Sequence, residues 1–412
     1  MTKTVLVVGA GQAGAEFALA YRAKNSTDRI VLVGEEPELP YRRPPLSKLF
    51  LARQMPQAQI YLHAEATYAK QNVELRLGLR AEAIDRNARR VRFADGSSEP
   101  YDTLVLATGG RVRSLSVPGA DASNVRYLRS LADAQALSAL LGPGKRLVII
   151  GGGYIGLEVA ATARGLETQV TVLESMPRVL ARVTAPELSA FYEKVHRDAG
   201  VVVRTDVQID HIEHGHQGSA VVLKSGERHP ADVILVGIGL IPNTELAADA
   251  GLDVDNGIRV DGHAQTSDPN ILAVGDCANH HNRLLNRRLR LESVPNAMEQ
   301  SRAAAATLAG TPTEYAPVPW FWSDQYKLKL QMAGLSQGHD QTVMRGDPAK
   351  QSFTVFYLSQ GAVIAADTVN HPPEHQLAKR MVAERLRPDI QRLADDTQPL
   401  KDLFITNTER KA

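Results

Sequence analysis

The sequence predicts an α/β protein with two domains, each built on a mostly parallel sheet covered by helices, and a smaller C-terminal α+β domain. An internal repeat carries this prediction, because a short apolar strand followed by a glycine turn occurs at residues 5–14 and again at 147–156. Each copy continues into an alanine-rich helical stretch and then a second apolar strand. Such alternation is typical of βαβ units. Beyond Pro317, aromatic residues and β-formers replace this pattern, which indicates a different domain.

The order of the apolar segments predicts that the second unit is inserted into the first. A strand at 101–108 leads into two glycines, and strands at 232–237 and 270–274 run into Gly-Ile-Gly and Gly-Asp turns. We therefore expect one domain from residues 1–113 and 245–317, a second from 114–244, and the C-terminal domain from 318–412.

Composition restricts the classes of function. Lys and Arg number 47 against 46 Asp and Glu, which leaves a formal net charge of +1 and none of the positive field of a dedicated nucleic-acid binder. No apolar run reaches the length of a membrane span, and the first strand begins too early for a signal peptide to precede it. The single cysteine, Cys277, excludes an internal disulfide. We expect a cytoplasmic protein that binds neither nucleic acid nor a membrane.

The first glycine turn carries the motif Gly9-Ala10-Gly11-Gln12-Ala13-Gly14. Gly9 permits the tight turn, Gly11 lets the backbone approach a pyrophosphate, and Gly14 lets the helix pack closely with its N-terminus toward the phosphates. Glu35 follows about 20 residues later, where an acid accepts a hydrogen bond from a ribose 2′-hydroxyl. Because the motif follows a strand, opens a helix and has its acid, it predicts a dinucleotide site rather than an ordinary flexible turn.

The second turn, Gly151-Gly152-Gly153-Tyr154-Ile155-Gly156, repeats this pattern and is followed by Glu174. A carboxylate accepts a hydrogen bond from a free 2′-hydroxyl but repels a 2′-phosphate. We therefore expect this turn to bind NADH in preference to NADPH. Arg178 and Arg182 follow shortly and leave some capacity for the extra phosphate.

Two nucleotide turns in one chain rarely serve two nicotinamides. A hydride donor needs an acceptor, and a flavin is the usual one. We therefore expect FAD at the first turn and NADH at the second, in a glutathione-reductase-like arrangement of two Rossmann-like domains.

Six further motifs accompany the turns. They are Arg43-Pro-Pro-Leu-Ser-Lys48, Ala107-Thr108-Gly109, Gly237-Ile238-Gly239-Leu-Ile-Pro-Asn243, Ala273-Val-Gly-Asp276-Cys277, Leu291-Glu-Ser-Val294-Pro-Asn296 and Trp320-Phe-Trp322-Ser-Asp-Gln-Tyr326. In order and spacing, the chain resembles the NADH-dependent ferredoxin reductases of bacterial oxygenase systems, the putidaredoxin-reductase type, from about residue 3 to residue 404.

The resemblance implies roles for these motifs. Asp276 would bind the ribitol of FAD, and Val294 would face the pyrimidine end of the flavin. Lys48 would lie beside the flavin in a pair with Glu158, and Trp320 at the flavin mouth, which makes these three the candidate catalytic residues. The implied FAD-binding set is Gly9, Gly11, Gln12, Ala13, Gly14, Glu35, Arg43, Lys48, Ala107, Thr108, Gly109, Asp276, Val294 and Trp320. The implied NADH-binding set is Gly151, Gly153, Tyr154, Ile155, Gly156, Glu174, Arg182, Gly237, Ile238 and Gly239.

The residue patterns alone leave structural alternatives open. Lys48 and Glu158 could form a purely structural ion pair, and Trp320 and Trp322 could belong to a core. Related flavoproteins that work through thiols place cysteines after the first βαβ unit, whereas this chain has none before Cys277. Electrons would therefore leave the flavin directly, which excludes dithiol chemistry.

No metal site is expected. Residues 371–375, His-Pro-Pro-Glu-His, match a zinc-protease pattern that requires a helix. Two consecutive prolines argue against a helix there.

The resemblance implies an activity and a partner. The enzyme would take a hydride from NADH onto FAD and pass single electrons to an acidic two-iron two-sulfur ferredoxin, which feeds a cytochrome monooxygenase or an aromatic-ring dioxygenase. The alternatives are another acceptor, such as rubredoxin or a quinone, and an apoptosis-inducing-factor-like flavoprotein that responds to NADH by binding a partner. Nothing in the sequence requires more than a monomer. The basic residues expected to meet the ferredoxin are Arg283, Arg287, Arg288, Arg290, Lys327 and Lys329.

Overall fold

The structure is a computed structural model that describes residues 2–25, 27–215 and 218–404, and the chain divides into two compact units. The first unit comprises Met1–Arg42, Gln57–Arg111 and Leu240–Pro319, and the second comprises Arg43–Pro56, Val112–Gly239 and Trp320–Ala412. The second unit thus holds residues 43–56, which the sequence assigned to the 1–113 segment, together with the C-terminal domain. Among the helices of the described residues, none is long and apolar enough to cross a membrane.

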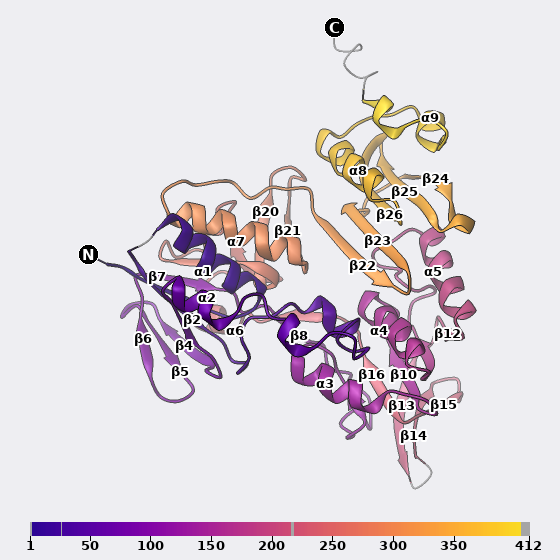
Figure 1. The fold of residues 1–412 in the computed structure, drawn as a ribbon, viewed down its shortest axis with the longest axis horizontal. Coiled ribbons are helices and arrows are strands. Elements are labelled where there is room, and N and C mark those ends of the chain that lie inside the picture. The colour runs from indigo at the N-terminus through magenta and orange to yellow at the C-terminus, as the bar shows by residue number, and fades with distance from the viewer. Residues whose placement is uncertain (1, 26, 216–217, 405–412) are drawn as a thin grey trace. The chain divides into compact units, whose positions relative to one another are not determined.

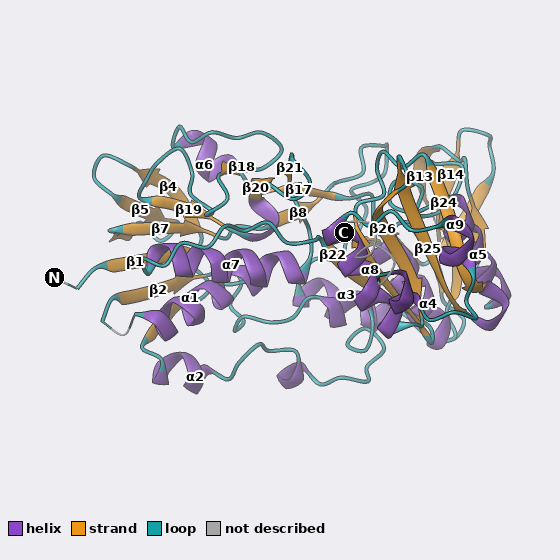
Figure 2. Cartoon of the chain, turned by 90° about the horizontal axis from the view of Figure 1, so that it is seen from above, coloured by secondary structure: helices purple, strands orange, loops and turns teal. Residues whose placement is uncertain are grey.

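A five-stranded parallel sheet in the order β19-β7-β1-β2-β3 forms the centre of the first unit. Its strands are β1 (Thr4–Val8), β2 (Arg29–Val33), β3 (Val73–Arg76), β7 (Thr103–Leu106) and β19 (Ile271–Ala273). Helices α1 (Gln12–Lys24) and α7 (Val294–Leu308) lie side by side along this sheet (Figures 1 and 2). One face packs against α1 and α7 and the other against residues 91–93 and 258–260, so both faces are covered and the strands read as continuous apolar runs rather than alternating ones.

Smaller elements complete the first unit. One antiparallel sheet contains β4 (Ala81–Asp85), β5 (Arg90–Phe93) and β6 (Ser98–Pro100). Another contains β18 (Ile258–Val260), β20 (Ala278–Asn282) and β21 (Arg287–Leu289). β8 (Gly110–Val112) pairs with β17 (Leu240–Pro242), and the short helices are α2 (Glu65–Lys70) and α6 (Glu245–Asp249).

The second unit repeats the first sheet. Its parallel strands run in the order β12-β11-β10-β16-β9, so β10 lies between β11 and β16 as β1 lies between β2 and β7. The strands are β9 (Val125–Arg126), β10 (Arg146–Ile150), β11 (Gln169–Leu173), β12 (Val202–Arg204) and β16 (Val233–Val236). The helices are α3 (Leu131–Leu140), α4 (Tyr154–Gly165) and α5 (Pro186–Asp198). A separate antiparallel sheet contains β13 (Ile209–Gly215), β14 (Gly218–Leu223) and β15 (Arg228–Ala231).

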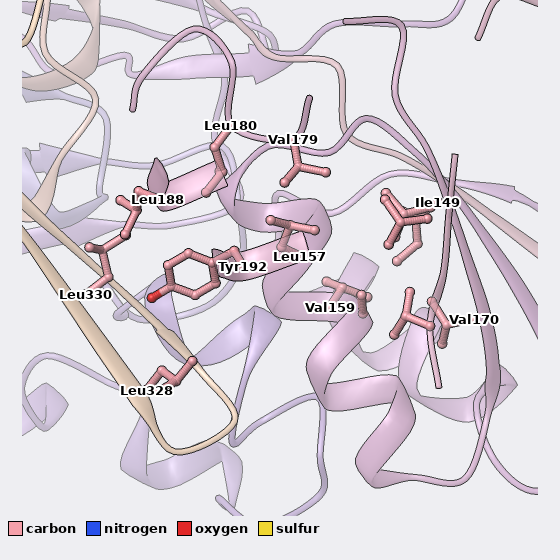
Figure 3. Packing of buried hydrophobic residues seen from close by; sticks show 14 of the residues in the cluster. Ile149, Leu157, Val159, Val170, Val179, Leu180, Leu188, Tyr192, Leu328 and Leu330 are labelled. Carbon is pink, nitrogen blue, oxygen red and sulfur yellow. The ribbon is translucent and has the colours of Figure 1, made fainter. Parts of the chain in front are cut away.

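The C-terminal part is an antiparallel sheet in the order β22-β23-β26-β25-β24 with two helices. The elements are β22 (Trp320–Gln325), β23 (Leu328–Gly334), β24 (Gln341–Asp347), β25 (Ser352–Ser359), β26 (Ala362–Val369), α8 (Pro372–Glu384) and α9 (Ile390–Ala394). Leu328 and Leu330 of β23 share one buried cluster with Leu157 of α4 and Tyr192 of α5 (Figure 3). The predicted fold class, two parallel-sheet units and a C-terminal α+β domain, is confirmed.

The start of α8 corrects the reasoning about residues 371–375. The helix begins at Pro372, with His371 as its N-cap, so consecutive prolines do not prevent a helix there. The first helical positions have no intrahelical acceptor for their N–H groups, and proline is therefore tolerated in this turn. Glu374 forms a buried ion pair with Arg345 at 2.7 Å. No group of three or more His, Cys, Asp or Glu side chains that could hold a metal ion occurs in the described part of the chain.

Candidate functional site

The first glycine turn joins β1 to α1 and is closed to side chains at two positions. A Cβ on Gly9, whose φ is +114°, would lie 2.1 Å from the carbonyl oxygen of Ala107. A Cβ on Gly14 would lie 1.9 Å from the carbonyl oxygen of Gly9. Gly11 is the N-cap of α1 and lacks a side-chain cap, and a Cβ there would meet nothing within 4 Å. The turn is therefore packed tightly, while the space beside Gly11 at the helix N-terminus fits a pyrophosphate.

The second glycine turn joins β10 to α4 with the same geometry. A Cβ on Gly151, whose φ is +112°, would lie 2.3 Å from the carbonyl oxygen of Gly237. A Cβ on Gly156 would lie 2.2 Å from the carbonyl oxygen of Gly151. Gly153 is the N-cap of α4 and is open, as Gly11 is. Each unit thus offers one cradle that fits the pyrophosphate of a dinucleotide.

Side chains at the second turn differ sharply in exposure. Ile155, in the first turn of α4, is 45% exposed, which is unusual for isoleucine. Tyr154 donates from its hydroxyl to Sδ of Met332 at 2.7 Å, and burial raises the pKa of Tyr154. Ile238 and Gly239 follow Gly237 at the carboxyl end of β16, beside this turn. The arrangement leaves an apolar side chain free to contact a flat ring.

The acid after each turn has a different environment. The side chain of Glu35 is 71% exposed, and its carboxylate lies 3.9 Å from Nε of Arg80. Glu174 is buried, and its two oxygens accept hydrogen bonds from the backbone N–H of Gly152 at 2.6 Å and of Met176 at 2.8 Å. Glu174 therefore braces the turn that it follows, which Glu35 does not.

Two arginines follow Glu174. Arg178 donates to Oγ of Ser189 at 2.5 Å and to the carbonyl of Ala181 at 3.1 Å, so its guanidinium is held within the protein. Arg182 is exposed. Of the two, Arg182 is the one free to reach a ligand.

Other candidate FAD-binding residues surround the first turn. Gln12 and Ala13 open α1, and a Cβ on Gly275 would lie 2.8 Å from Cβ of Ala13. Asp276 follows Gly275 at the carboxyl end of β19, in the short 3-10 helix Gly275–Cys277. Cys277 is fully buried, and burial raises the pKa of its thiol. Asp276 thus lies at the same edge of the sheet as the turn, where α/β proteins bind ligands.

Two of the motifs are joined to each other. The hydroxyl of Thr108 donates to the carbonyl of Asn243 at 2.7 Å, and the side-chain amide of Asn243 donates to the carbonyl of Thr108 at 2.9 Å. The backbone N–H of Asn243 also donates to the carbonyl of Gly109 at 3.0 Å. These bonds hold together the two segments at which the chain leaves the first unit and returns to it.

The candidate flavin-facing helix begins at Val294. Ser293 is its N-cap, with a hydroxyl that accepts from the N–H of Asn296 at 3.2 Å. Asn296 also accepts a hydrogen bond from the hydroxyl of Tyr315 at 2.8 Å. The N-terminus of α7 is therefore fixed in place, and its partial positive charge suits an anionic ring.

The predicted pair of Lys48 and Glu158 is present in the second unit. Nζ of Lys48 lies 2.6 Å from Oε2 of Glu158, and the hydroxyl of Ser47 donates to the same oxygen at 2.6 Å. The hydroxyl of Ser323 donates to the other oxygen, Oε1, at 2.7 Å. Glu158 is 2% exposed, so three donors offset the cost of burying its carboxylate.

The turn that carries Lys48 is held by side-chain and backbone bonds. Arg43 precedes the 3-10 helix Pro44–Ser47 and donates from Nη1 to the carbonyl of Arg129 at 2.5 Å. The hydroxyl of Thr162 donates to the carbonyl of Ser47 at 2.8 Å. This packing explains why residues 43–56 belong to the second unit.

The tryptophans of β22 lie on one face of their strand. The ring centroids of Trp320 and Trp322 are 5.8 Å apart, and Nζ of Lys379 lies 4.9 Å from the centroid of Trp320. His375 of α8 lies on the same side, with its ring 5.9 Å from Trp320. Both tryptophans are half-buried, so they are available to a ligand as well as to the core.

The expected basic docking residues have mixed environments. Arg283 pairs with Glu314, and Arg290 with Glu292, while Arg288 donates to two backbone carbonyls. Lys327 and Lys329 are exposed, although only Lys329 lies within β23. The arginines belong to the first unit and the lysines to the second.

Sequence reasoning missed two members of the Glu158 cluster. Ser47 and Ser323 lie inside the motifs that include Lys48 and Trp320, yet neither was assigned a role. Ser323 lies two residues before Gln325, so both side chains point to the same side of β22. That alternation was the available signal.

Comparison with known proteins identifies the relatives of this chain. The family described as pyridine nucleotide-disulphide oxidoreductase matches residues 3–301, and the family described as reductase C-terminal matches residues 320–404. The putidaredoxin reductase of Pseudomonas putida is 48% identical over 97% of this chain and 96% of its own length. The ferredoxin–NAD(+) reductase component of an anthranilate 1,2-dioxygenase system from Burkholderia cepacia is 45% identical, with 96% and 98% covered. A rubredoxin–NAD(+) reductase of Pseudomonas putida is 38% identical, with 89% and 96% covered.

A solved structure agrees with these sequences. The covalent complex of putidaredoxin reductase with putidaredoxin contains a chain with a TM-score of 0.95 and 48% identity, and 98% of each chain is covered. The resemblance inferred from the motifs, and the enzyme class that it implied, are confirmed. The chain therefore belongs to the pyridine nucleotide-disulphide oxidoreductase family, among the ferredoxin–NAD(+) reductases that share its C-terminal domain.

Proposed function

We propose that this protein is an FAD-dependent reductase that oxidises NADH and passes electrons one at a time to a two-iron two-sulfur ferredoxin of an oxygenase system. The observation that carries the proposal is the pair of equivalent glycine turns in one chain, each with an open N-cap glycine at a helix N-terminus. Two such cradles suit a hydride donor and a hydride acceptor. The names of the relatives, putidaredoxin reductase and a dioxygenase-system ferredoxin–NAD(+) reductase, support the acceptor.

Bound FAD would supply the redox chemistry, because a flavin accepts two electrons together and can release them singly. The chain contributes binding and orientation. The first turn, with Glu35, Asp276 and Val294, would hold FAD, and the resemblance assigns Arg43, Lys48 and Trp320 to the flavin as well. The single cysteine, Cys277, is fully buried, which supports direct transfer of electrons from the flavin to the partner rather than through a thiol.

The second turn would hold NADH. Ile155 and the Gly237–Gly239 segment would contact the nicotinamide, and Glu174 would accept from the adenosine ribose while repelling a 2′-phosphate. The Lys48–Glu158 pair lies on the unit that carries this turn, with Glu158 on helix α4 itself. Its proposed role is to place a positive charge beside the flavin where the hydride arrives.

The partner would be an acidic ferredoxin that meets the protein through exposed basic residues, foremost Lys327 and Lys329. We further propose a monomer in the cytoplasm. A rubredoxin is the second candidate acceptor, because one relative, 38% identical, is a rubredoxin–NAD(+) reductase.

Anaerobic stopped-flow spectroscopy of the purified flavoprotein tests this proposal. NADH should bleach the flavin faster than NADPH, and the reduced enzyme should then reduce a two-iron ferredoxin rapidly. Rubredoxin and a soluble quinone serve as competing acceptors in the same instrument. Rapid bleaching followed by transfer only to rubredoxin or quinone would overturn the ferredoxin assignment, and no bleaching by NADH would overturn the whole proposal.

A further inference from the structure

The buried carboxylate of Glu158 ends a chain of hydrogen bonds that extends to the protein surface. Oε1 of Glu158 accepts from Ser323, and Oγ of Ser323 accepts from Nε2 of Gln325 at 3.2 Å. Oε1 of Gln325 lies 2.8 Å from Nε2 of His196, and Nδ1 of His196 lies 3.1 Å from the hydroxyl of Tyr326. We call these four residues, Ser323, Gln325, His196 and Tyr326, the donor chain. All of them, and Glu158, belong to the second unit.

The direction of each bond follows from the groups that form it. A carboxylate only accepts, so Ser323 donates to Glu158, and the amide N–H₂ of Gln325 donates to Ser323. The amide oxygen of Gln325 then requires a proton on Nε2 of His196, which leaves Nδ1 to accept from Tyr326. Burial lowers the pKa of His196, which favours the neutral ring that this pattern requires. Every donor in the chain therefore points toward Glu158.

The burial of its side chains shows that the donor chain is part of the core and is not a chance contact at the surface. Ser323 and His196 are 0% exposed and Gln325 is 1% exposed, whereas Tyr326 is 40% exposed. Ser323 and Gln325 occupy alternate positions of β22 and so face one side of the strand, opposite Trp320 and Trp322. His196 comes from the last turn of α5. Two elements distant in sequence thus supply aligned polar groups to one carboxylate.

The donor chain cannot conduct protons to Glu158. A proton that moved along it toward Glu158 would have to add to the amide oxygen of Gln325 while another left its amide nitrogen, which requires the unfavourable imidic-acid form of the amide. Aligned hydrogen bonds do polarise one another, and a carboxylate that accepts fixed donors is held in one orientation. The chain therefore orients and stabilises a charge but does not move a proton.

We propose that Ser323, Gln325 and His196 are positioning residues that fix the Glu158 carboxylate and, through it, the ammonium group of Lys48. The inference rests on the proposed role of Lys48 and Glu158 at the flavin. It also explains the Ser-x-Gln spacing in β22 and the presence of a buried histidine at the end of α5. It also implies that the influence on Lys48 weakens with each bond away from Glu158.

The test compares variants of the FAD-loaded enzyme by the rate of flavin reduction at saturating NADH. Ser323→Ala should lower this rate about tenfold, the effect of losing one hydrogen bond to a charged group. Gln325→Leu should lower it less, and Tyr326→Phe less than about twofold, while KM for NADH changes little. Asp324→Asn is the matched control, since Asp324 lies on the same strand and faces the other side.

The double variant Ser323→Ala/Glu158→Gln decides whether Ser323 acts through Glu158. If it does, the double variant should reduce its flavin no more slowly than Glu158→Gln alone. Rate losses that multiply, or a fall in melting temperature with an unchanged rate, would overturn the positioning role. If Glu158→Gln itself left the rate unchanged, the proposed role of the Lys48–Glu158 pair would fail instead. The two failures are therefore distinguishable.

Discussion

The two glycine turns follow one plan although they serve different units. In each, the first glycine lies against a carbonyl at the end of a neighbouring strand, that of Ala107 or of Gly237. The backbone N–H of the first glycine donates to the end of the second strand at 2.8 Å in both turns. The N-cap glycine is open in both. The cradle thus has the same geometry with the buried acid of the second unit and without one in the first.

The acids after the turns break this equivalence. Strand register pairs Val8 with Val33 and Ile150 with Leu173, so the next residue is Gly34 in the first unit and Glu174 in the second. Glu35 lies one position further along.

The second residue of the turn also differs between the units: it is Ala10 in the first and Gly152 in the second. A Cβ on Gly34 would lie 2.6 Å from Cβ of Ala10, whereas a Cβ on Gly152 would lie 3.2 Å from Oε2 of Glu174. In the second unit, a glycine at the second position of the turn makes room for the buried acid Glu174. In the first unit, the alanine at that position lies against Gly34, the residue that follows the second strand. The spacing of an acid from its motif does not reveal whether it braces the turn.

The largest expected effect comes from substituting the tightly packed first glycine of either turn. Gly9→Ala and Gly151→Ala place a methyl group about 2 Å from a backbone carbonyl in a positive-φ conformation. Each should lower stability by about 4 kcal/mol or more, seen as a large fall in melting temperature. Gly11→Ala and Gly153→Ala are the matched controls, because their methyl groups meet nothing within 4 Å.

These controls should keep the melting temperature of the cofactor-free protein but lose affinity, for FAD in Gly11→Ala and for NADH in Gly153→Ala. Equal destabilisation by all four substitutions would show that the open positions are not reserved for phosphates. Flavin content and NADH titration provide the measurement.

The second expected effect concerns the acids that the two units bury. Asp28 of the first unit accepts from the N–H of Lys3, the hydroxyl of Tyr21 and the amide of Asn25. Asp367 of the second unit is buried and accepts from the hydroxyl of Tyr357 at 2.5 Å. Burial raises the pKa of Asp367 to about 7, only partly opposed by that hydrogen bond.

An acid whose pKa is higher in the folded than in the unfolded state binds a proton more tightly when folded. The free energy of unfolding therefore falls as pH rises from about 4 to about 7, by a few kcal/mol, and stays low above that range. Asp367→Asn should remove this dependence and melt at a higher temperature than the parent at pH 8. Thermal melts between pH 5 and pH 8 measure it, and parallel pH profiles in parent and variant would contradict the expectation.

The third prediction sharpens the difference between the two acids after the turns. Glu174→Gln removes the charge that would repel a 2′-phosphate, so the ratio of kcat/KM for NADPH to that for NADH should rise about tenfold. Glu35→Gln should change FAD affinity by less than about fivefold, because this carboxylate is largely exposed. Steady-state kinetics with both nucleotides and flavin titration give the two values. An unchanged nucleotide preference in Glu174→Gln would show that the buried acid only braces the turn.

Local patterns made much of the fold predictable. The glycine turns, the strands around them and the start of α7 near Asn296 depend on neighbouring residues, so the sequence reveals them. The prediction that the prolines after His371 prevent a helix is wrong, because the first two helical positions tolerate proline whereas interior positions do not.

Long-range partners were less accessible to sequence reasoning. The Lys48–Glu158 pair was expected only through the resemblance, and Ser323 joins it from a strand 165 residues along the chain. The basic segment before Leu291 looked like a docking surface, yet Arg283 and Arg290 form ion pairs within the first unit. Charge along a sequence does not reveal which side chains already have partners.

The smallest expected effect concerns the two arginines that follow Glu174, Arg178 and Arg182. Arg182 is exposed while Arg178 is bonded to Ser189 and Ala181, so only Arg182 can move to meet a 2′-phosphate. Arg182→Ala should lower kcat/KM for NADPH about two- to fivefold, the size of an exposed charge pair, and leave kcat/KM for NADH within about twofold. Added salt should reduce the difference, because an exposed pair is screened. A larger loss with NADH than with NADPH would place Arg182 on the pyrophosphate that both nucleotides share.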